Sequence, residues 1–221
     1  MKKLSAILMI LILSIFLVIG SAGATAMLFL DDKAGHTLTV TDGNDDGVLN
    51  FVYPGIMGAW DSIIISAMTK PSWGDDLTPQ LAMQVQATSA EPADLSVLFT
   101  STDYAPADMV PFDSNIGGTT SGMVWAFTFY DRDNIGFSRE DQVINSIGPL
   151  GPGAFSDTES DTIFPGGNEY SVTLVCDISH TSGGDSTVNL AGNSVPEPAT
   201  MLLFGAGLVG LAGFGRKKYK K

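Results

Sequence analysis

The chain of 221 residues has 24 acidic and 11 basic residues and a formal net charge of −13. Most basic residues stand near the two ends, so that residues 27–198 hold only four of them, Lys33, Lys70, Arg132 and Arg139, beside all 24 acidic ones, a net charge of −20. This excess repels phosphate backbones and anionic lipid surfaces, which excludes nucleic-acid binding as an expected function. The single cysteine excludes an internal disulfide.

The first 26 residues have the features of a secretory signal peptide. Lys2 and Lys3 give a positive start, Leu4–Ile19 is apolar, and Ala24 and Ala26 are small residues at the spacing that a signal peptidase prefers. We predict export through the Sec translocon and cleavage after Ala26. The apolar stretch has 16 residues, which leaves an uncleaved anchor as the alternative. No cysteine stands at the end of this stretch, so a lipoprotein anchor is excluded.

The region between the two ends predicts strands and turns, without convincing helical periodicity. Runs rich in β-branched or aromatic residues predict strands at 37–41, 62–66, 81–86, 95–99, 122–130, 169–177 and 186–190. Groups of Gly, Pro, Asn and Asp predict turns at 42–47, 114–118, 148–153 and 165–168. The pattern favours an all-β fold, with residues 27–180 forming a single β-sandwich of jelly-roll or immunoglobulin-like type. Residues 181–195 are small and polar, which predicts a linker.

The only cysteine lies within the predicted strand at 169–177. Tyr170, Val172, Leu174 and Cys176 share one face of this strand because strand side chains alternate. Free cysteine behaves as a small apolar residue, so we expect Cys176 to be buried and inert. Stability must then come from packing rather than from crosslinks.

The best metal-binding pattern is the segment from Asp42 to Val48. Asp42, Asn44 and Asp46 supply side-chain oxygens and Val48 a carbonyl at the spacing that opens a calcium loop. Tyr53 stands where the closing Glu would be, so calcium would need a further ligand, such as Asp31, Asp32 or Asp61. The alternative is a plain hairpin turn, since Asp-Gly and Asn-Asp are preferred turn formers.

Patterns typical of enzymes are weak. His36 and His180 are the only histidines, and neither lies in a metal-binding or nucleophile motif. We therefore expect no catalytic activity, and no cofactor other than calcium. Trp60, Trp73 and Trp125 are candidates for a sugar-stacking face, although the apolar strand around Trp125 favours a core position for it.

The C-terminal segment has three parts in a fixed order. Pro196-Glu197-Pro198 is followed by an apolar run of 17 residues, Ala199–Gly215, and by a basic tail that starts at Arg216, Lys217 and Lys218. The run is just long enough to cross a bilayer as a helix. Its basic tail predicts a stop-transfer signal, with the residues before Pro196 on the exported side. The two prolines hold Glu197 extended, as a protease cleft requires.

This arrangement, residues 196–221 with Val195 before them, resembles the PEP-CTERM sorting signal of Gram-negative bacteria. The resemblance implies that an integral-membrane exosortase recognises Pro196, Glu197 and Pro198 and removes the tail. The alternative is an ordinary C-terminal membrane anchor. Residues 38–137 more loosely resemble a β-rich ectodomain of such proteins, on Val40-Thr-Asp-Gly43, Gly58–Ile65, Leu95–Tyr104 and Gly117–Asn134. That ectodomain has no assigned reaction.

The resemblance implies a route and a setting. The protein would be anchored transiently in the inner membrane and would finally reach the cell surface or the extracellular space. We expect a structural or adhesive role in a biofilm matrix, with exopolysaccharide as a partner. The alternatives are a calcium-dependent carbohydrate-binding module and a secreted hydrolase.

Overall fold

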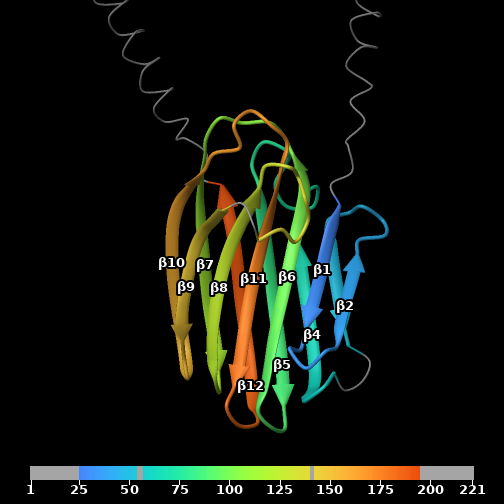
Figure 1. Cartoon of the computed structure of the whole chain (residues 1–221), viewed down its shortest axis with the longest axis vertical. Helices are drawn as coiled ribbons and strands as arrows, with labels where there is room; N and C mark the ends of the chain where they lie inside the picture. Colours follow the sequence, from blue (N-terminus) through green and yellow to red (C-terminus); the bar gives the residue numbers. More distant parts are fainter. Residues whose placement is uncertain (1–24, 54–56, 140–141, 195–221) are drawn as a thin grey trace, which may run out of the picture.

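The computed structural model describes residues 25–53, 57–139 and 142–194, and all regular secondary structure in them is β (Figure 1). The strands are β1 (Ala26–Asp31), β2 (Thr37–Thr41), β3 (Val48–Val52), β4 (Trp60–Met68), β5 (Gln80–Ser89), β6 (Ala93–Tyr104), β7 (Val110–Thr120), β8 (Met123–Asp131), β9 (Gln142–Leu150), β10 (Gly153–Ile163), β11 (Tyr170–His180) and β12 (Gly184–Ser194).

These strands form two antiparallel sheets packed face to face. Sheet A has the order β2-β1-β6-β11-β8-β9, and sheet B has the order β10-β7-β12-β5-β4-β3. From β5 to β12 the chain passes between the sheets so that β10-β7-β12-β5 faces β6-β11-β8-β9, which is the double Greek key of a jelly roll. The hairpin β1–β2 adds two strands to the edge of sheet A, and the hairpin β3–β4 adds two strands to the edge of sheet B. The predicted β-sandwich is confirmed, and its topology is the jelly roll.

Alternating side chains build the core between the sheets. In β5, Leu81, Met83, Val85 and Ala87 face inward and are buried, while the residues between them face outward. The largest fully buried side chains include Trp60, Tyr104, Tyr130, Tyr170, Phe99 and Phe112. Burial of an apolar side chain such as Phe99 or Phe112 contributes about 1.5–3 kcal/mol.

Sheet A also has a second, outer apolar layer. Leu98, Phe129 and Val175 point away from the main core and are buried nonetheless. The β8–β9 connection, residues 132–139 of which are described, lies over this face (Figure 1) and brings Phe137 to 5.8 Å from the Phe29 ring. Arg139 Nη2 donates to Ser96 Oγ at 3.1 Å. Central strands β6 and β11 are therefore buried on both faces.

The seven predicted strands are confirmed, but the predicted turn at 114–118 was wrong. These residues lie inside β7. A Cβ on Gly118 would come within 2.0 Å of the Thr187 carbonyl oxygen, so Gly118 permits a close approach of β12 rather than a turn. The predicted turns at 42–47 and 165–168 are loops, and 148–153 spans the end of β9 and the start of β10.

The predicted linker at 181–195 was also wrong for most of its length. Residues 184–194 form β12, a central strand between β5 and β7. Its small residues serve packing, since a Cβ on Gly192 would lie 2.7 Å from the Phe112 ring. The folded domain therefore continues to Ser194.

Candidate functional site: an uncharged groove and the sorting segment

A row of polar side chains crosses the outer face of sheet B. Asn50 on β3, Ser66 on β4, Gln84 on β5 and Asn189 on β12 stand directly opposite one another in the strand register, and Gly117 continues the row on β7. Strands in a sheet are about 4.8 Å apart, so the row is about 19 Å long. All five residues take the outward positions that alternate with the core positions.

The neighbouring row on the same face is mainly apolar. It consists of Val48, Met68, Ala82 and Ala191, and ends at Asn115 on β7. Because the small side chains of Ala82 and Ala191 leave space in this row, the two rows enclose a hollow of about 530 Å³. We call this hollow the amide groove.

Hydrogen bonds arrange the amides along the groove. Gln84 Nε2 donates to Asn189 Oδ1 at 2.8 Å, and Thr158 Oγ1 donates to Asn115 Oδ1 at 2.9 Å. Each primary amide has two N–H donors and an oxygen with two lone pairs. These contacts use only part of that capacity, so donors and acceptors remain available to a ligand.

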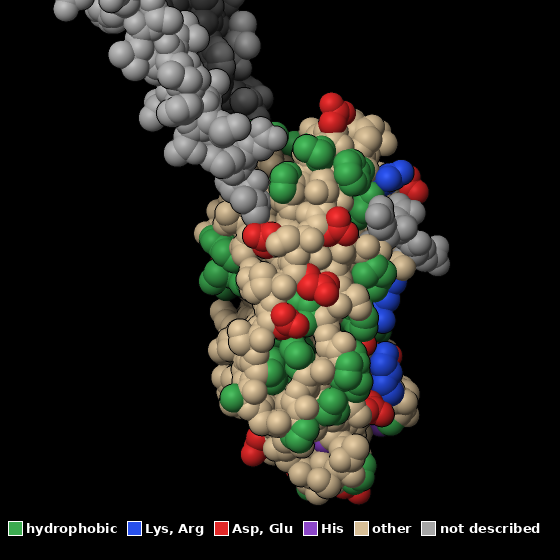
Figure 2. Space-filling model, turned by 90° about the vertical axis from the view of Figure 1, so that its left-hand side faces the viewer, with side chains coloured by type: hydrophobic (Ala, Val, Ile, Leu, Met, Phe, Trp, Pro, Cys, Tyr) green, Lys and Arg blue, Asp and Glu red, His purple; other side chains and the backbone are tan. Residues whose placement is uncertain are grey.

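The groove is also free of charge. None of the described residues that line it is Asp, Glu, Lys or Arg, although the exported region has a net charge of −20. Acidic side chains lie instead on other surfaces, for example over the β9–β10 edge, where Figure 2 shows them along the molecule. An uncharged groove suits a neutral ligand, because it offers no opposite charge to pair with an ionic one.

The sequence did not single out this groove. Asn50, Ser66, Gln84 and Asn189 are ordinary outward polar residues when each strand is considered alone. Only the register of four strands brings them together. The signal that could have pointed to the groove was the recurrence of uncharged amide and hydroxyl side chains at outward strand positions in an otherwise acidic chain.

The predicted calcium loop connects β2 to β3, and its carboxylates accept hydrogen bonds from the loop itself. Asp42 is buried, and its two oxygens accept from Gly47 N at 2.7 Å and Asn44 N at 3.2 Å. Asp46 accepts from Val48 N at 2.8 Å and from Asn44 Nδ2 at 2.8 Å. This is the hydrogen bonding of an Asx turn. Across residues 25–53, 57–139 and 142–194, no three His, Cys, Asp or Glu side chains group as a metal site.

The two histidines lie in separate environments. His180 is buried, and its ring nitrogens lie 2.7 Å from Ser89 Oγ and 2.8 Å from Ser186 Oγ, which joins sheet A to sheet B. Burial lowers the pKa of His180. His36 lies 2.6 Å from Asp32. Burial acts to raise the pKa of Asp32, but hydrogen bonds from His36 and Ala34 outweigh it and hold that pKa below its usual value.

Cys176 and the tryptophans complete the predicted residues within the fold. Cys176 is fully buried, as expected, and burial raises the pKa of its thiol. Trp60 is in the core, where its Nε1 donates to the Asp94 carbonyl at 3.0 Å. Trp125 lies half-buried on the outer face of sheet A, so the expectation of a core position was wrong.

Most of the predicted processing residues lie outside the described part of the chain. These are Ala24, Pro196, Glu197, Pro198, Arg216, Lys217 and Lys218. Ala26 is described and opens β1, where its carbonyl accepts from Asp42 N at 2.9 Å. Cleavage after Ala26 stays a prediction, and it would remove this acceptor. Within the described residues, no helix has the length and apolarity to span a bilayer.

Comparison with protein families decides the nature of the C-terminal segment. The PEP-CTERM protein-sorting motif matches residues 194–217. The chain carries a PEP-CTERM sorting motif. The motif indicates a protein that is exported and sorted to the outside by an exosortase. No curated protein matches the sequence.

Three solved structures show likeness to the domain that precedes the PEP-CTERM motif. The K1 cleaved adhesin domain of Lys-gingipain from Porphyromonas gingivalis W83 is 10% identical, with 68% of this chain and 98% of that chain covered and a TM-score of 0.34. The enzymatically active domain of bacteriophage CBA120 tailspike protein 4 is 13% identical, covering 64% and 20%, with a TM-score of 0.34. A family 29 carbohydrate binding module, CBM29-2, is 9% identical, covering 66% and 80%, with a TM-score of 0.25. Scores this low say nothing about activity.

The PEP-CTERM motif follows the fold without an intervening spacer. β12 ends at Ser194, whose N–H donates to the Pro79 carbonyl at 2.8 Å. Pro196, the first residue of the Pro-Glu-Pro tripeptide, comes only two residues later. In the sequence, the sorting motif therefore begins directly at the end of β12.

Proposed function

We propose that the protein is a non-catalytic, adhesive component of the extracellular matrix and that its amide groove binds a neutral polysaccharide. The proposal rests on the amide groove, which combines a polar row with an apolar row and has no charged side chain among its described lining residues. Sugar rings present hydroxyl groups at their edges and C–H groups on their faces. The amides of Gln84 and Asn189 match the hydroxyls, and the apolar row of Met68, Ala82 and Ala191 matches the C–H faces.

The route to the matrix follows from the sorting segment. The chain is anchored in the inner membrane by Ala199–Gly215, with Arg216, Lys217 and Lys218 on the cytoplasmic side, until the exosortase acts near Pro196–Pro198. The released or transferred domain then holds polysaccharide in a biofilm. An open groove of about 19 Å across five strands suits a chain that continues beyond the site at both ends.

Two observations support a role without catalysis. Both ring nitrogens of His180 are occupied by buried serine hydroxyls, and His36 is paired with Asp32. None of the described residues that line the amide groove is an Asp or Glu, so those residues do not supply the acid pair that glycoside hydrolysis requires. We therefore expect no turnover when the secreted protein is incubated with polysaccharide or ester substrates. Turnover that a single acidic or serine substitution abolishes would contradict this role.

Affinity electrophoresis of the secreted protein tests the binding proposal. Native gels containing neutral dextran, galactomannan or hydroxyethylcellulose are compared with gels containing anionic alginate. We expect at least one neutral polymer to retard the protein and alginate to have no effect. The double variant Gln84→Ala/Asn189→Ala should lose retardation, since each lost hydrogen bond weakens binding by about two- to tenfold.

A matched control lies on the same strand and face. Asn193→Ala removes an outward amide of β12 that does not line the groove, so its retardation should equal that of the unaltered protein. Equal retardation of the double variant and the unaltered protein would contradict the assignment of the groove. Retardation by none of the neutral polymers would contradict polysaccharide binding.

A further inference from the structure

Large apolar side chains are exposed at the end of the sandwich where β12 terminates. Leu77, Met109, Ile135 and Phe164 are 70%, 52%, 56% and 48% exposed. They lie on four different connections: β4–β5, β6–β7, β8–β9 and β10–β11. We call these four residues the apolar rim. Exposed apolar residues gathered at one end mark an interaction surface more often than scattered ones do.

Hydrogen bonds to backbone carbonyls hold these connections in place at one end of the sandwich. Ala105 N donates to the Asp76 carbonyl at 2.8 Å, and Gly167 N donates to the Ala107 carbonyl at 3.0 Å. Ser171 Oγ donates to the Ile135 carbonyl at 2.8 Å. The four connections lie at the upper end in Figure 1, and Figure 2 shows hydrophobic side chains at the same end.

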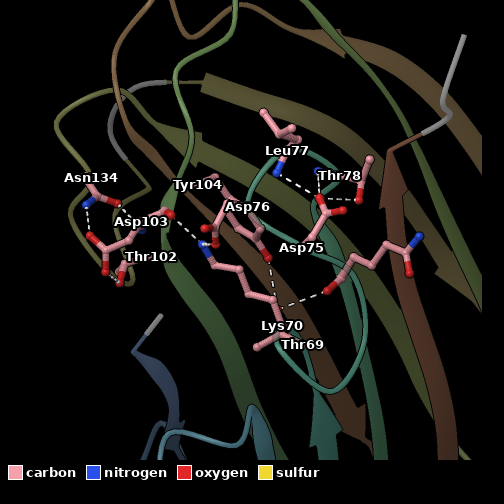
Figure 3. Close-up of polar contacts among 11 residues, drawn as sticks. Thr69, Lys70, Asp75, Asp76, Leu77, Thr78, Thr102, Asp103, Tyr104 and Asn134 are labelled. Atoms are coloured by element: carbon pink, nitrogen blue, oxygen red, sulfur yellow. Dashed lines mark hydrogen bonds and ion pairs between the residues drawn. The ribbon is translucent and has the colours of Figure 1, made fainter. Parts of the chain in front are cut away.

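The connection that carries Leu77 is held in place by a buried lysine. Lys70 Nζ donates to Asp76 Oδ1 at 2.7 Å and to the Asp103 carbonyl, and lies 4.4 Å from the centre of the Tyr104 ring (Figure 3). Because Lys70 is 2% exposed, its ammonium depends on these partners.

A second set of contacts fixes Leu77 itself. Asp75 Oδ1 accepts from Leu77 N at 2.9 Å and from Thr78 N and Thr78 Oγ1 at 2.7 and 2.6 Å. The Leu77 side chain extends away from the Lys70 contacts (Figure 3). The exposure of Leu77 is thus built into an ordered loop.

The sorting segment brings this end close to the membrane. The backbone N–H of Ser194 donates a hydrogen bond to the carbonyl of Pro79, at the end of the β4–β5 connection. The apolar run begins at Ala199, five residues after Ser194, and five extended residues span at most about 18 Å. While that run crosses the bilayer, the apolar rim is held beside the membrane surface.

We infer that the apolar rim inserts into the lipid–water interface on the exported side of the inner membrane while the chain is anchored. This inference rests on the anchoring in the proposed function. Asp75, Asp76 and Asp108 lie on the same connections, so the contact is apolar insertion into a zwitterionic surface rather than attraction to anionic lipid. The contact keeps the folded domain at the membrane surface while the chain is anchored, and it weakens once the tether is cut.

A fluorescence experiment on the full chain in phosphatidylcholine vesicles tests this inference. Leu77→Cys, Met109→Cys and Phe164→Cys are each labelled with an environment-sensitive fluorophore, and the vesicles carry a head-group spin-label quencher. Cys176 does not compete for the label because it is fully buried. Val52→Cys, 63% exposed on β3, is the control. We expect loss of emission at the three rim positions and none at Val52. No exosortase is present, so quenching reports lipid alone.

Flotation of the vesicles separates the possible failures. If the chain floats with the vesicles and the rim probes are no more quenched than Val52, the inference is wrong although the anchor stands, and a photo-crosslinker at Leu77 would then identify a protein partner. If the chain does not float, the anchor and the inference both fail. In the variant Leu77→Asp/Phe164→Asp, the Met109 probe should lose its quenching. Quenching that persists would show proximity by tethering without insertion, which also overturns the inference.

Discussion

The outer face of sheet A is covered by another part of the chain, whereas the outer face of sheet B is exposed. On sheet A, Leu98, Phe129 and Val175 form a second apolar cluster beneath the β8–β9 connection. On sheet B, the corresponding face is uncovered and carries the polar row of Gln84 and Asn189 beside a hollow. Both faces arise from the same alternation of side chains along strands. The difference shows that one outer face is covered by the chain itself, while the other is exposed, which is why the proposed binding site lies on sheet B.

The covered face should give the largest effect on stability. Leu98→Ala deletes a side chain that is 4% exposed, and buried Leu→Ala changes cost about 2–5 kcal/mol. We expect about 3 kcal/mol, measured as a lower denaturant midpoint with an unchanged slope. The matched control is Met68→Ala on the outer face of sheet B, where the side chain is 43% exposed and the cost should stay below about 1 kcal/mol. Equal costs would mean that the β8–β9 connection does not form a third layer.

The loop between β2 and β3 belongs to neither face. Removing the Asp42 carboxylate that holds this loop should have the next largest effect on stability. Asp42→Ala removes two charge-assisted hydrogen bonds from Gly47 N and Asn44 N, so we expect a loss of about 2 kcal/mol in the free energy of unfolding. The loss should be the same with and without calcium. Exposed Asp61→Ala is the control and should change little. A melting temperature that calcium raises in the unaltered protein, and not in Asp42→Ala, would instead support the predicted calcium site.

The contrast between the two faces also explains what the sequence could predict. The seven predicted strands were confirmed, and Cys176 was found buried, because alternation is a local property that survives without knowledge of pairing. The glycines at 118 and 192 were misread as turn and linker residues. Their role is a close approach to Thr187 and Phe112, which exists only after β7 and β12 have found their places.

The same limit applies to the candidate site. Asn50 and Asn189 lie far apart in the chain, and only the register through Ser66 and Gln84 makes them one row. The sorting motif, by contrast, is contiguous and could be recognised directly from Pro196-Glu197-Pro198, the apolar run and the basic tail.

His180 on sheet A is hydrogen-bonded to two serines on sheet B, so its protonation should change the free energy of unfolding of the whole sandwich. Burial lowers the pKa of His180 below its unfolded value of about 6.5, so the unfolded state takes up the proton first. The stabilisation is fully present above about pH 6.5 and is lost as the pH falls below it. We expect the free energy of unfolding to decline as the pH falls below about 6.5, by less than Leu98→Ala costs.

The control for this decline is His180→Asn, which should flatten the pH dependence whatever its own cost. Carboxylates act in a different window. Hydrogen bonding from the Thr78 hydroxyl lowers the pKa of Asp75, so its contribution is lost only as the pH falls below about 3.9. A decline that persists in His180→Asn below about pH 6.5 and well above about pH 3.9 would therefore assign the dependence to another group.

The smallest effect on stability is expected on the open face, for a substitution of Gly117 on β7. The next residue, Gly118, faces the other way and serves as the comparison. A Cβ on Gly117 meets only the Phe155 carbonyl oxygen at an ordinary 3.6 Å, whereas one on Gly118 would lie 2.0 Å from the Thr187 carbonyl oxygen. Gly117→Ala should therefore leave the free energy of unfolding unchanged or raise it by up to about 1 kcal/mol, because alanine loses less backbone entropy on folding. Gly118→Ala, the control, should be strongly destabilising. Gly117→Ala places a methyl group in the amide groove, so retardation by a neutral polysaccharide should fall while stability does not. A variant that binds as well as the unaltered protein would show that the hollow beside Asn189 takes no part in binding.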